Sequence, residues 1–289
     1  MYTTNEVEVL GLQLENPVLV GSGLLTDQAR NIRRLLDGGA GAVVTKTIHP
    51  SPPRDLDERI LRLPTGMLNS TTYSKRTVEE WLGHLRSFAA DDLPVIASVH
   101  ADSPGELASL AARIEETGCR ALELGISCLN EEDGLEDTPE RVFEYTSKVR
   151  EATSLPIAVK LAIGESLHSR ALAAIEAGAS ALSISDTIPG AAIAASSREL
   201  ELGGVFGYSG PGIKPLVLAA IFGLRRRGIT VPMLGIGGIA TPADVRDYLA
   251  VGCEAVQVYT ALHTDMYSTL GSIVRGVREE LAEPASVAS

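Results

Sequence analysis

The sequence predicts a single (β/α)8 barrel, and three observations support this fold class. Eight short apolar runs recur along the 289 residues, they begin in two alternating ways, and segments with helical periodicity lie between most of them. Continuous apolar runs indicate parallel strands covered on both faces. Eight such βα units are typical of a barrel of about 250 residues. A doubly wound open sheet is the alternative, but the fourfold repeat of strand pairs favours one barrel domain over residues 1–289.

Four of the expected strands begin at a proline, which a strand tolerates at its first residue. These prolines are Pro17, Pro94, Pro156 and Pro232. The other four strands follow a glycine turn, which is typical of a helix C-cap that leads into a strand. These glycines are Gly39, Gly118, Gly178 and Gly252. Interleaved, the two kinds place strands near residues 17, 42, 94, 121, 156, 181, 232 and 255.

The segments between the strands have helical patterns. Examples are SPGELASLAARIEETG and ESLHSRALAAIEAG, and in the second Leu167, Ala171 and Ala174 recur on one side of a helix. The opening VEVLGLQLEN alternates on either side of Gly11 and predicts a small N-terminal β-hairpin that closes the bottom of the barrel.

Composition excludes several classes of protein. The formal net charge of −12 argues against nucleic acid or an anionic membrane as the main partner. No apolar run reaches the roughly 18 residues of a membrane span, and the N-terminal residues lack the pattern of a signal peptide. The three cysteines, Cys119, Cys128 and Cys253, cannot form a disulfide framework and suit a reducing cytoplasm. We therefore expect a cytoplasmic protein.

Barrel active sites lie at the C-terminal ends of the strands. After the seventh strand comes GIGGIATPADV, with Gly237 and Gly238, and after the eighth comes YTALHTD, with Tyr259 and Thr260. Backbone N–H groups before a helix can hold a phosphate, and these two loops form the common phosphate site of barrels. The turn GYSGPGIKP could lie beside them. The alternative is that these glycines only make tight turns. Two such loops at the expected strand ends favour a phosphate site over this alternative, whereas a single glycine pair would not. We therefore expect a phosphate-bearing cofactor or substrate.

Two lysines end expected strands, Lys46 in VVTKT and Lys160 in IAVKLA. Lysine is scarce, with five among the 25 basic residues. A lysine at a strand end can simply extend its side chain to solvent, but two of these five at the barrel mouth favour a functional role. A desolvated lysine could form a Schiff base. A lysine cation could instead stabilise an anionic reduced flavin. Spacing alone does not choose between these.

Cys128 follows the fourth strand in a polar loop, LELGISCLNEEDG, where a packing cysteine is not expected. A loop thiol can act as nucleophile, metal ligand or general base. Cys119 and Cys253 instead occupy the small-residue position of a glycine turn and suit burial. The histidines show no metal-ligand spacing, so we expect no metal, although His49 and His100 follow strands and could approach the barrel mouth.

Taken together, the motifs resemble those of class 1 dihydroorotate dehydrogenases, in order and spacing, from about residue 6 to residue 280. The matching segments are NPVLVGSG, VVTKTIHP, GMLNS, LELGISCLN, IAVKLA, GYSGPGIKP, GIGGIATPADV and YTA. The resemblance implies an FMN-dependent oxidoreductase that acts on CH–CH groups of a small molecule and forms a homodimer. Because the chain lacks cysteines for an iron–sulfur centre and a second dinucleotide domain, a separate electron-transfer partner, a soluble acceptor or oxygen could take the electrons.

The resemblance also implies roles for individual residues. Cys128 would be the general base or acid, with Lys46 and Lys160 as further catalytic residues. The implied FMN contacts are Gly21, Ser22, Lys46, Thr47, Ser98, Lys160, Ser185, Gly210, Gly237, Gly238, Tyr259 and Thr260. The implied substrate contacts are Asn69, Asn130, Asp186 and Thr187.

The substrate motifs depart from the family pattern. Gly125 stands where the family has asparagine, and Asp186 replaces a second asparagine, so that an acceptor-only carboxylate replaces an amide. Thr72 and Tyr73 replace the glycine and leucine after Asn69. Leu129 replaces a proline, and the loop residues 131–133 are acidic.

These departures predict weaker binding of dihydroorotate by about two to four decades, since losing a buried hydrogen-bond partner costs about 1–3 kcal/mol. We therefore expect the family's hydride transfer beside a carbonyl, on a substrate other than dihydroorotate. A genuine dihydroorotate dehydrogenase with an altered pocket is the alternative. A Lys160 Schiff-base lyase and a non-catalytic FMN-binding barrel are further alternatives, and the direction of the reaction stays open.

Overall fold

The computed structural model describes residues 7–51, 58–130 and 137–282, so the acidic loop residues 131–133 lie outside the described residues. Eight parallel strands close into a barrel in the order β10-β13-β14-β3-β4-β7-β8-β9. The barrel strands are β3 (Val18–Val20), β4 (Ala42–Val44), β7 (Val95–Val99), β8 (Leu122–Gly125), β9 (Ile157–Leu161), β10 (Ala181–Ile184), β13 (Met233–Ile236) and β14 (Ala255–Val258). The predicted fold class is confirmed, and each barrel strand lies where the sequence placed it.

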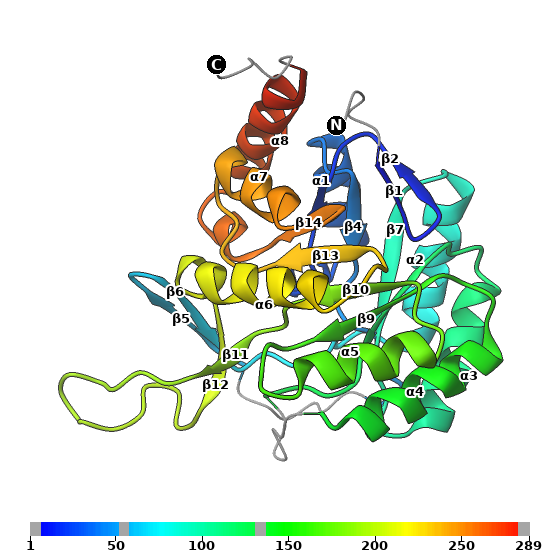
Figure 1. Cartoon of the computed structure of the whole chain (residues 1–289), viewed down its shortest axis with the longest axis horizontal. Helices are drawn as coiled ribbons and strands as arrows, with labels where there is room; N and C mark the ends of the chain where they lie inside the picture. Colours follow the sequence, from blue (N-terminus) through cyan, green and yellow to red (C-terminus); the bar gives the residue numbers. More distant parts are fainter. Residues whose placement is uncertain (1–6, 52–57, 131–136, 283–289) are drawn as a thin grey trace.

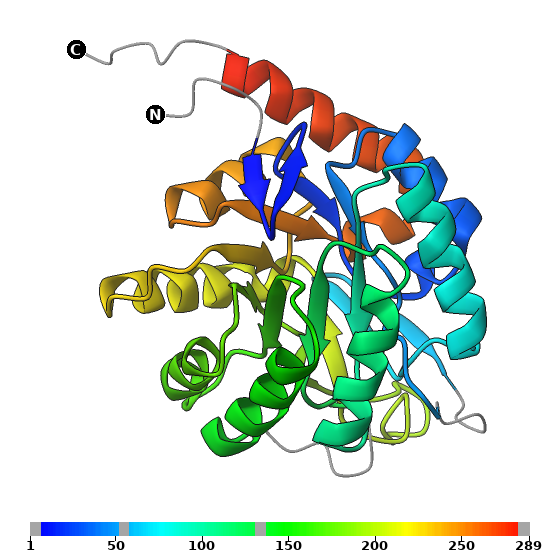
Figure 2. The same cartoon turned by 90° about the vertical axis from the view of Figure 1, so that its right-hand side faces the viewer.

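Helices surround this barrel on the outside (Figure 2). They are α1 (Ala29–Asp37), α2 (Val78–Ala90), α3 (Pro104–Glu115), α4 (Pro139–Ala152), α5 (Leu167–Glu176), α6 (Lys214–Arg226), α7 (Pro242–Ala250) and α8 (Met266–Ala282), with 3-10 turns η1 (Leu24–Thr26), η2 (Pro211–Ile213) and η3 (Thr260–His263). Four begin at a threonine or serine whose side chain accepts a backbone N–H of the first turn, which stabilises a helix start. These caps are Thr77, Ser103, Thr138 and Thr241. Within the described ranges, no helix is long and apolar enough to cross a membrane.

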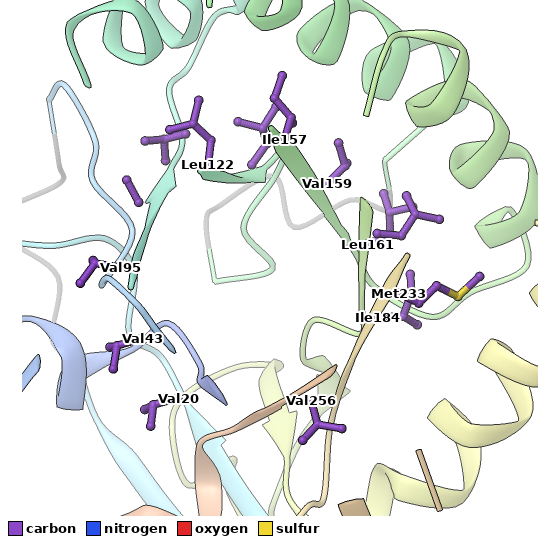
Figure 3. Close-up of a cluster of buried hydrophobic side chains, with 14 of the residues drawn as sticks. Val20, Val43, Val95, Leu122, Ile157, Val159, Leu161, Ile184, Met233 and Val256 are labelled. Atoms are coloured by element: carbon purple, nitrogen blue, oxygen red, sulfur yellow. The ribbon is translucent and has the colours of Figure 1, made fainter. Parts of the chain in front are cut away.

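The core has an outer and an inner part. In the outer part, strand side chains such as Val20, Val159 and Met233 point away from the barrel axis toward the helices (Figure 3). The inner part fills the lower barrel with Leu19, Ile96, Leu234 and several alanines.

The hairpin of β1 (Val7–Val9) and β2 (Leu12–Leu14) completes the inner cluster. Its Val9, Leu12 and Leu14 are buried together with the inward-facing strand residues. The hairpin therefore closes the bottom of the barrel, as the alternating pattern around Gly11 predicted.

A second sheet at the barrel mouth was not predicted. Its four strands are β5 (Ile60–Leu63), β6 (Gly66–Asn69), β11 (Ile188–Gly190) and β12 (Phe206–Ser209), in the order β11-β12-β6-β5. Figure 1 shows this sheet on the other side of the barrel from the N-terminal hairpin. The strands come from the chain after β4 and the chain after β10, and β12 pairs with β6 across about 140 residues. This pairing brings the segment around Asn69 to the mouth.

Candidate active site

Strand geometry determines which side chains face the inside of the barrel. Side chains alternate between the two faces of a strand. The inner apolar cluster, with residues such as Ile96, faces the barrel axis, so the residue two positions further along each strand also points inward. On five strands these residues are polar: Ser98, Glu123, Lys160, Ser183 and Gln257. The inside of the barrel thus changes from apolar at the hairpin end to polar and charged below the mouth.

A cavity that opens to solvent lies above this polar layer. All but one of the predicted site residues line it: Gly21, Ser22, Lys46, Thr47, Asn69, Ser98, Cys128, Asn130, Lys160, Ser185, Asp186, Thr187, Gly237, Gly238, Tyr259 and Thr260. Gly210 instead lines a neighbouring cavity, which shares Gly238 and Thr260 with the first. The structure therefore brings together residues from all eight barrel strands or the loops after them.

Glycines form one end of this cavity. Gly237 and Gly238 have φ of 133° and 70°, and Gly210 has φ of 107°, a region that favours glycine. A Cβ on Gly238 would lie 2.8 Å from the carbonyl oxygen of Gly210, so the two loops approach too closely for a side chain. Thr260 Oγ1 donates to Ser209 Oγ at 2.9 Å, which ties the loop after β14 to the same place.

The N–H groups just before α7 are occupied within the protein. The Asp244 carboxylate accepts the N–H groups of Ala240 at 2.9 Å and Thr241 at 2.8 Å. Those two donors are therefore occupied by the helix's own acid and are not available to a ligand.

A row of hydroxyls crosses the neighbouring strands β3, β4 and β7. Ser22 Oγ lies 3.2 Å from Thr47 Oγ1, which lies 3.0 Å from Ser98 Oγ. Tyr259 packs against Gly23, where a Cβ would lie 2.1 Å from the tyrosine ring, and burial raises the pKa of Tyr259 to about 12. The Tyr259 phenol therefore stays neutral, and its ring forms part of the cavity lining next to Gly23.

Lys46 is buried and fixed in place. Only 4% of the residue is exposed, and its Nζ donates to the backbone oxygen of Thr72. Burial lowers the pKa of Lys46, although the charged forms of Cys128, Glu58 and Asp27 oppose that shift. This lysine therefore faces the cavity with its ammonium already held by one acceptor.

Lys160 differs because two carboxylates surround it. Its Nζ lies 3.8 Å from Oε1 of Glu123 and 3.8 Å from Oδ1 of Asp186. Burial lowers the pKa of Lys160, but Asp186, Glu123 and Cys128 together outweigh burial and raise it above the usual value. Lys160 is therefore a cation at neutral pH, whereas a Schiff-base lysine must be neutral to attack a carbonyl.

Cys128 lies half-buried on the loop after β8, while Cys119 and Cys253 are buried, as their positions in the glycine turns predicted. The charged form of Cys128 raises the pKa of both Lys46 and Lys160, so the thiol lies within electrostatic range of two ammonium groups. Neighbouring cations favour a thiolate. The arrangement can therefore supply a base beside the Lys160 cation and the buried Lys46 in one cavity.

Asn69 and Asn130 form one network at the other end of the cavity. Asn130 Nδ2 donates to Asn69 Oδ1 at 3.2 Å and to the Thr71 oxygen at 2.7 Å, and Asn130 Oδ1 accepts Gly207 N–H at 2.9 Å. Asn69 Nδ2 donates to the Gly207 oxygen at 3.2 Å. The second sheet thus orients both amides.

The residues that depart from the family pattern change this end of the cavity. Thr72 donates its backbone N–H at 2.8 Å and its hydroxyl at 2.9 Å to the Glu58 carboxylate. A chain carboxylate thereby takes a donor that a substrate carboxylate could use. Gly125 leaves space, because a Cβ there would meet nothing closer than the Val99 oxygen at 4.0 Å.

His49, His100 and Asp102 come together beside the cavity, within 4.8 Å of one another by their potential metal-binding atoms. Only His100 lines the cavity. His49 Nδ1 accepts Ser51 N–H at 3.0 Å, so its Nε2 carries the proton and donates to Asp102 Oδ1 at 3.2 Å.

Two carboxylates that contact the candidate site residues, Glu123 and Glu58, were missed by sequence reasoning, because these contacts join distant segments. Glu123 is 1% exposed, and its Oε2 accepts from Ser183 Oγ at 2.7 Å and from Gln257 Nε2 at 2.5 Å. A glutamate inside the apolar run ALELG was the one available signal. Glu58 gave no signal, since it contacts Thr72 only through the β5–β6 hairpin.

The fold and cavity define a barrel protein with a glycine-lined end and a thiol–lysine end in one cavity. Comparisons with known proteins identify the family. The family model described as dihydroorotate dehydrogenase matches residues 4–281. The chain therefore belongs to the dihydroorotate dehydrogenase family, which confirms the resemblance and the expected enzyme class, a flavin-dependent oxidoreductase that acts on CH–CH groups.

Curated relatives support this assignment. The catalytic subunit of dihydroorotate dehydrogenase B (NAD(+)) of Pyrococcus furiosus is 34% identical over 286 residues, covering 96% of this chain and 94% of the relative. Proteins of the same name are 32% identical over 285 residues in Methanothermobacter thermautotrophicus, with 96% and 93% coverage, and 35% identical over 264 residues in Pelobacter propionicus, with 88% and 86% coverage. These names favour the alternative, a genuine dihydroorotate dehydrogenase, over a different substrate.

Proposed function

We propose that this chain binds FMN and oxidises dihydroorotate to orotate as the catalytic subunit of a larger enzyme. One observation carries the proposal: Cys128, Lys46 and Lys160 line one cavity together with the glycine loop after β13. The names of the relatives supply the substrate and the second subunit. A single domain over residues 1–289, a homodimer and a cytoplasmic location belong to the same proposal.

The residues present fit FMN. The three glycines with positive φ let the loops pack without side chains: a Cβ on Gly238 would lie 2.8 Å from the Gly210 oxygen, and one on Gly237 would lie 2.9 Å from the Ile213 side chain. Gly237, Gly238, Tyr259 and Thr260, with Gly210 beside them, would hold the phosphate. Ser22, Thr47 and Ser98 would bind the ribityl and ring atoms, with Gly21 and Ser185 against the ring. The residues expected to bind the substrate, Asn69, Cys128 and Asn130, line the same open cavity, so a small molecule would lie beside the cofactor.

The chain's own residues would then supply acid–base chemistry and electrostatics. When bound, FMN supplies a hydride acceptor at N5. Cys128 removes a proton from the neighbouring carbon of the substrate, and the Lys160 cation favours the thiolate that this step needs. Asn69 and Asn130, already oriented by the second sheet, hold the substrate, and Thr187 and Asp186 close the opposite side.

The test combines a spectrum with turnover. Purified protein is expected to be yellow and to release FMN on denaturation, and dihydroorotate is expected to reduce a dye acceptor at a steady rate that Cys128→Ala abolishes. A colourless protein contradicts the cofactor. A yellow protein that does not turn over dihydroorotate contradicts the substrate alone.

A substrate other than dihydroorotate is the second candidate, because two features of the cavity favour it. The Thr72 N–H is donated to Glu58 and not to the open cavity, and Asp186 adds a carboxylate that repels an anionic substrate. A substrate without a carboxylate, with a donor or cationic group toward Asp186, suits these contacts. Orotate binding weaker than millimolar to FMN-loaded protein would support this candidate, and micromolar binding would contradict it.

The two remaining alternatives have less support. A Schiff-base lyase needs a neutral Lys160, whereas the pKa of Lys160 is raised by Asp186, Glu123 and Cys128 despite burial. A non-catalytic FMN-binding barrel would keep its biological activity after Cys128→Ala, and the same variant tests it.

A further inference from the structure

The Lys160 ammonium lies between two carboxylates that approach it from neighbouring strands. Glu123 lies on β8 and Lys160 on β9, while Asp186 follows β10, and these three strands pair side by side. At 3.8 Å from each carboxylate oxygen, the ammonium makes two ion pairs and no short hydrogen bond. One cation thus faces two anions, so the cluster carries a net charge of −1.

Glu123 is the buried member of this cluster, and hydrogen bonds hold its side chain in place. Its buried Oε2 accepts two side-chain donors, from Ser183 and Gln257, whereas its Oε1 has no hydrogen-bond partner within the described residues. A carboxylate oxygen that is buried without a donor keeps its charge poorly screened. Glu123 therefore offsets the lysine charge from below the cavity.

Asp186 is the partly exposed member of this cluster. Its side chain is 38% exposed, its Oδ1 accepts the Thr187 N–H at 2.7 Å, and it lines the cavity together with Lys160. The family motif has asparagine at this position. Compared with that pattern, this chain places one additional negative charge beside the lysine that the resemblance assigns to FMN.

We propose that Asp186, acting through Lys160, lowers the midpoint potential of bound FMN, so that the reduced cofactor gives up its electrons more readily than it would beside asparagine. This inference rests on the proposed function, since it requires FMN in the cavity. A hydride carries two electrons and one proton, so the cofactor gains one negative charge when the substrate C–H bond breaks. A nearby cation stabilises that charge and a nearby anion opposes it. Asp186 is a positioning residue, because it exchanges neither hydride nor proton.

The experiment measures the midpoint potential of the FMN-loaded protein by spectroelectrochemical titration at constant pH. Asp186→Asn is expected to shift the potential to more positive values by at least about 30 mV, which corresponds to a tenfold change in the equilibrium of a two-electron couple. Asp102→Asn is the matched control. It makes the same chemical change at a side chain that is 70% exposed and pairs with His49 outside the cavity lining, so no shift is expected.

Each outcome decides the inference. Equal potentials for the wild type and Asp186→Asn overturn it, as does an equal shift in Asp102→Asn. If Asp186→Asn loses FMN, Asp186→Ser must show the positive shift, or the inference fails. Purified wild type without FMN overturns both the inference and the proposed function. Yellow wild type that does not oxidise dihydroorotate overturns the substrate only, and the potentials still decide the role of Asp186.

Discussion

The two ends of the cavity are built in different ways. At the end formed by Gly210, Gly237 and Gly238, backbone conformation makes the shape, and a side chain on Gly238 would collide with another backbone segment. At the end with Cys128, Lys160 and the asparagines, charged and polar side chains determine the chemistry. The glycine end agrees with the family pattern, whereas the side-chain end departs from it. A shape made by backbone tolerates few substitutions, while side chains can be exchanged to suit another substrate without disturbing the fold.

The largest effect is expected at the side-chain end, from Cys128→Ser. Loss of a positioned base typically costs about 10²–10⁴-fold in rate, so kcat is expected to fall by that factor while the FMN spectrum stays unchanged. Stopped-flow reduction of the flavin by substrate measures it. Cys119→Ala, at a buried thiol outside the cavity, is the control and should keep full activity. Unchanged kcat in Cys128→Ser would show that Cys128 is not the base and that the side-chain end does not supply the acid–base chemistry.

A pH effect on stability should come from His100 at the same end. Burial, only partly opposed by the hydrogen bond to the Gly125 oxygen, lowers the pKa of His100 to about 4. The unfolded chain takes up this proton near pH 6.5, before the folded state does, so stability falls as pH drops from about 6.5 to 4, by ~3 kcal/mol. Urea unfolding at pH 7.5 and 4.5 measures it. His100→Phe should remove that part of the pH dependence. If the wild type and His100→Phe lose the same stability between the two pH values, the effect does not come from His100.

The glycine end is probed by Gly238→Ala. The new Cβ would lie 2.8 Å from the Gly210 oxygen at a φ of 70°, and strain of about 1–3 kcal/mol should weaken FMN binding roughly 10–100-fold. Fluorescence titration of the apoprotein with FMN measures the Kd. Gly223→Ala, where a Cβ meets nothing within 4 Å, is the control. FMN affinity equal in both variants would mean that this loop does not hold the phosphate.

The smallest effect should come from Glu58→Ala, which sharpens the question of substrate. Removing the carboxylate releases the Thr72 N–H and one negative charge, so orotate binding should tighten by about tenfold. Glu58→Gln keeps an acceptor oxygen without the charge and should show a smaller gain. Titration of FMN-loaded protein with orotate, followed by flavin absorbance, measures both. Unchanged affinity in Glu58→Ala would show that the contact to Thr72 does not restrict an anionic substrate.

Much of the barrel could be predicted from local sequence because each strand is short, apolar and preceded by a proline or glycine signal. The second sheet could not, because its strands carry glycine, proline and polar residues and pair across about 140 residues. The same difference applies to the site. Lys46, Lys160 and Cys128 end predicted strands or follow them directly. Glu123, Glu58 and His100 gain their significance from partners on other elements.

The sequence by itself determined the barrel, the closing hairpin and the set of side chains at the mouth, because the periods of strands and helices are local properties of the chain. It also placed the departures from the family, Gly125 and Asp186, at the ends of their strands. Only the tertiary structure decided that Lys160 lies between two carboxylates and that Glu58 takes the Thr72 N–H. These contacts depend on the closure of the barrel and on pairing between β6 and β12, and such distances between remote segments are not encoded in any local pattern.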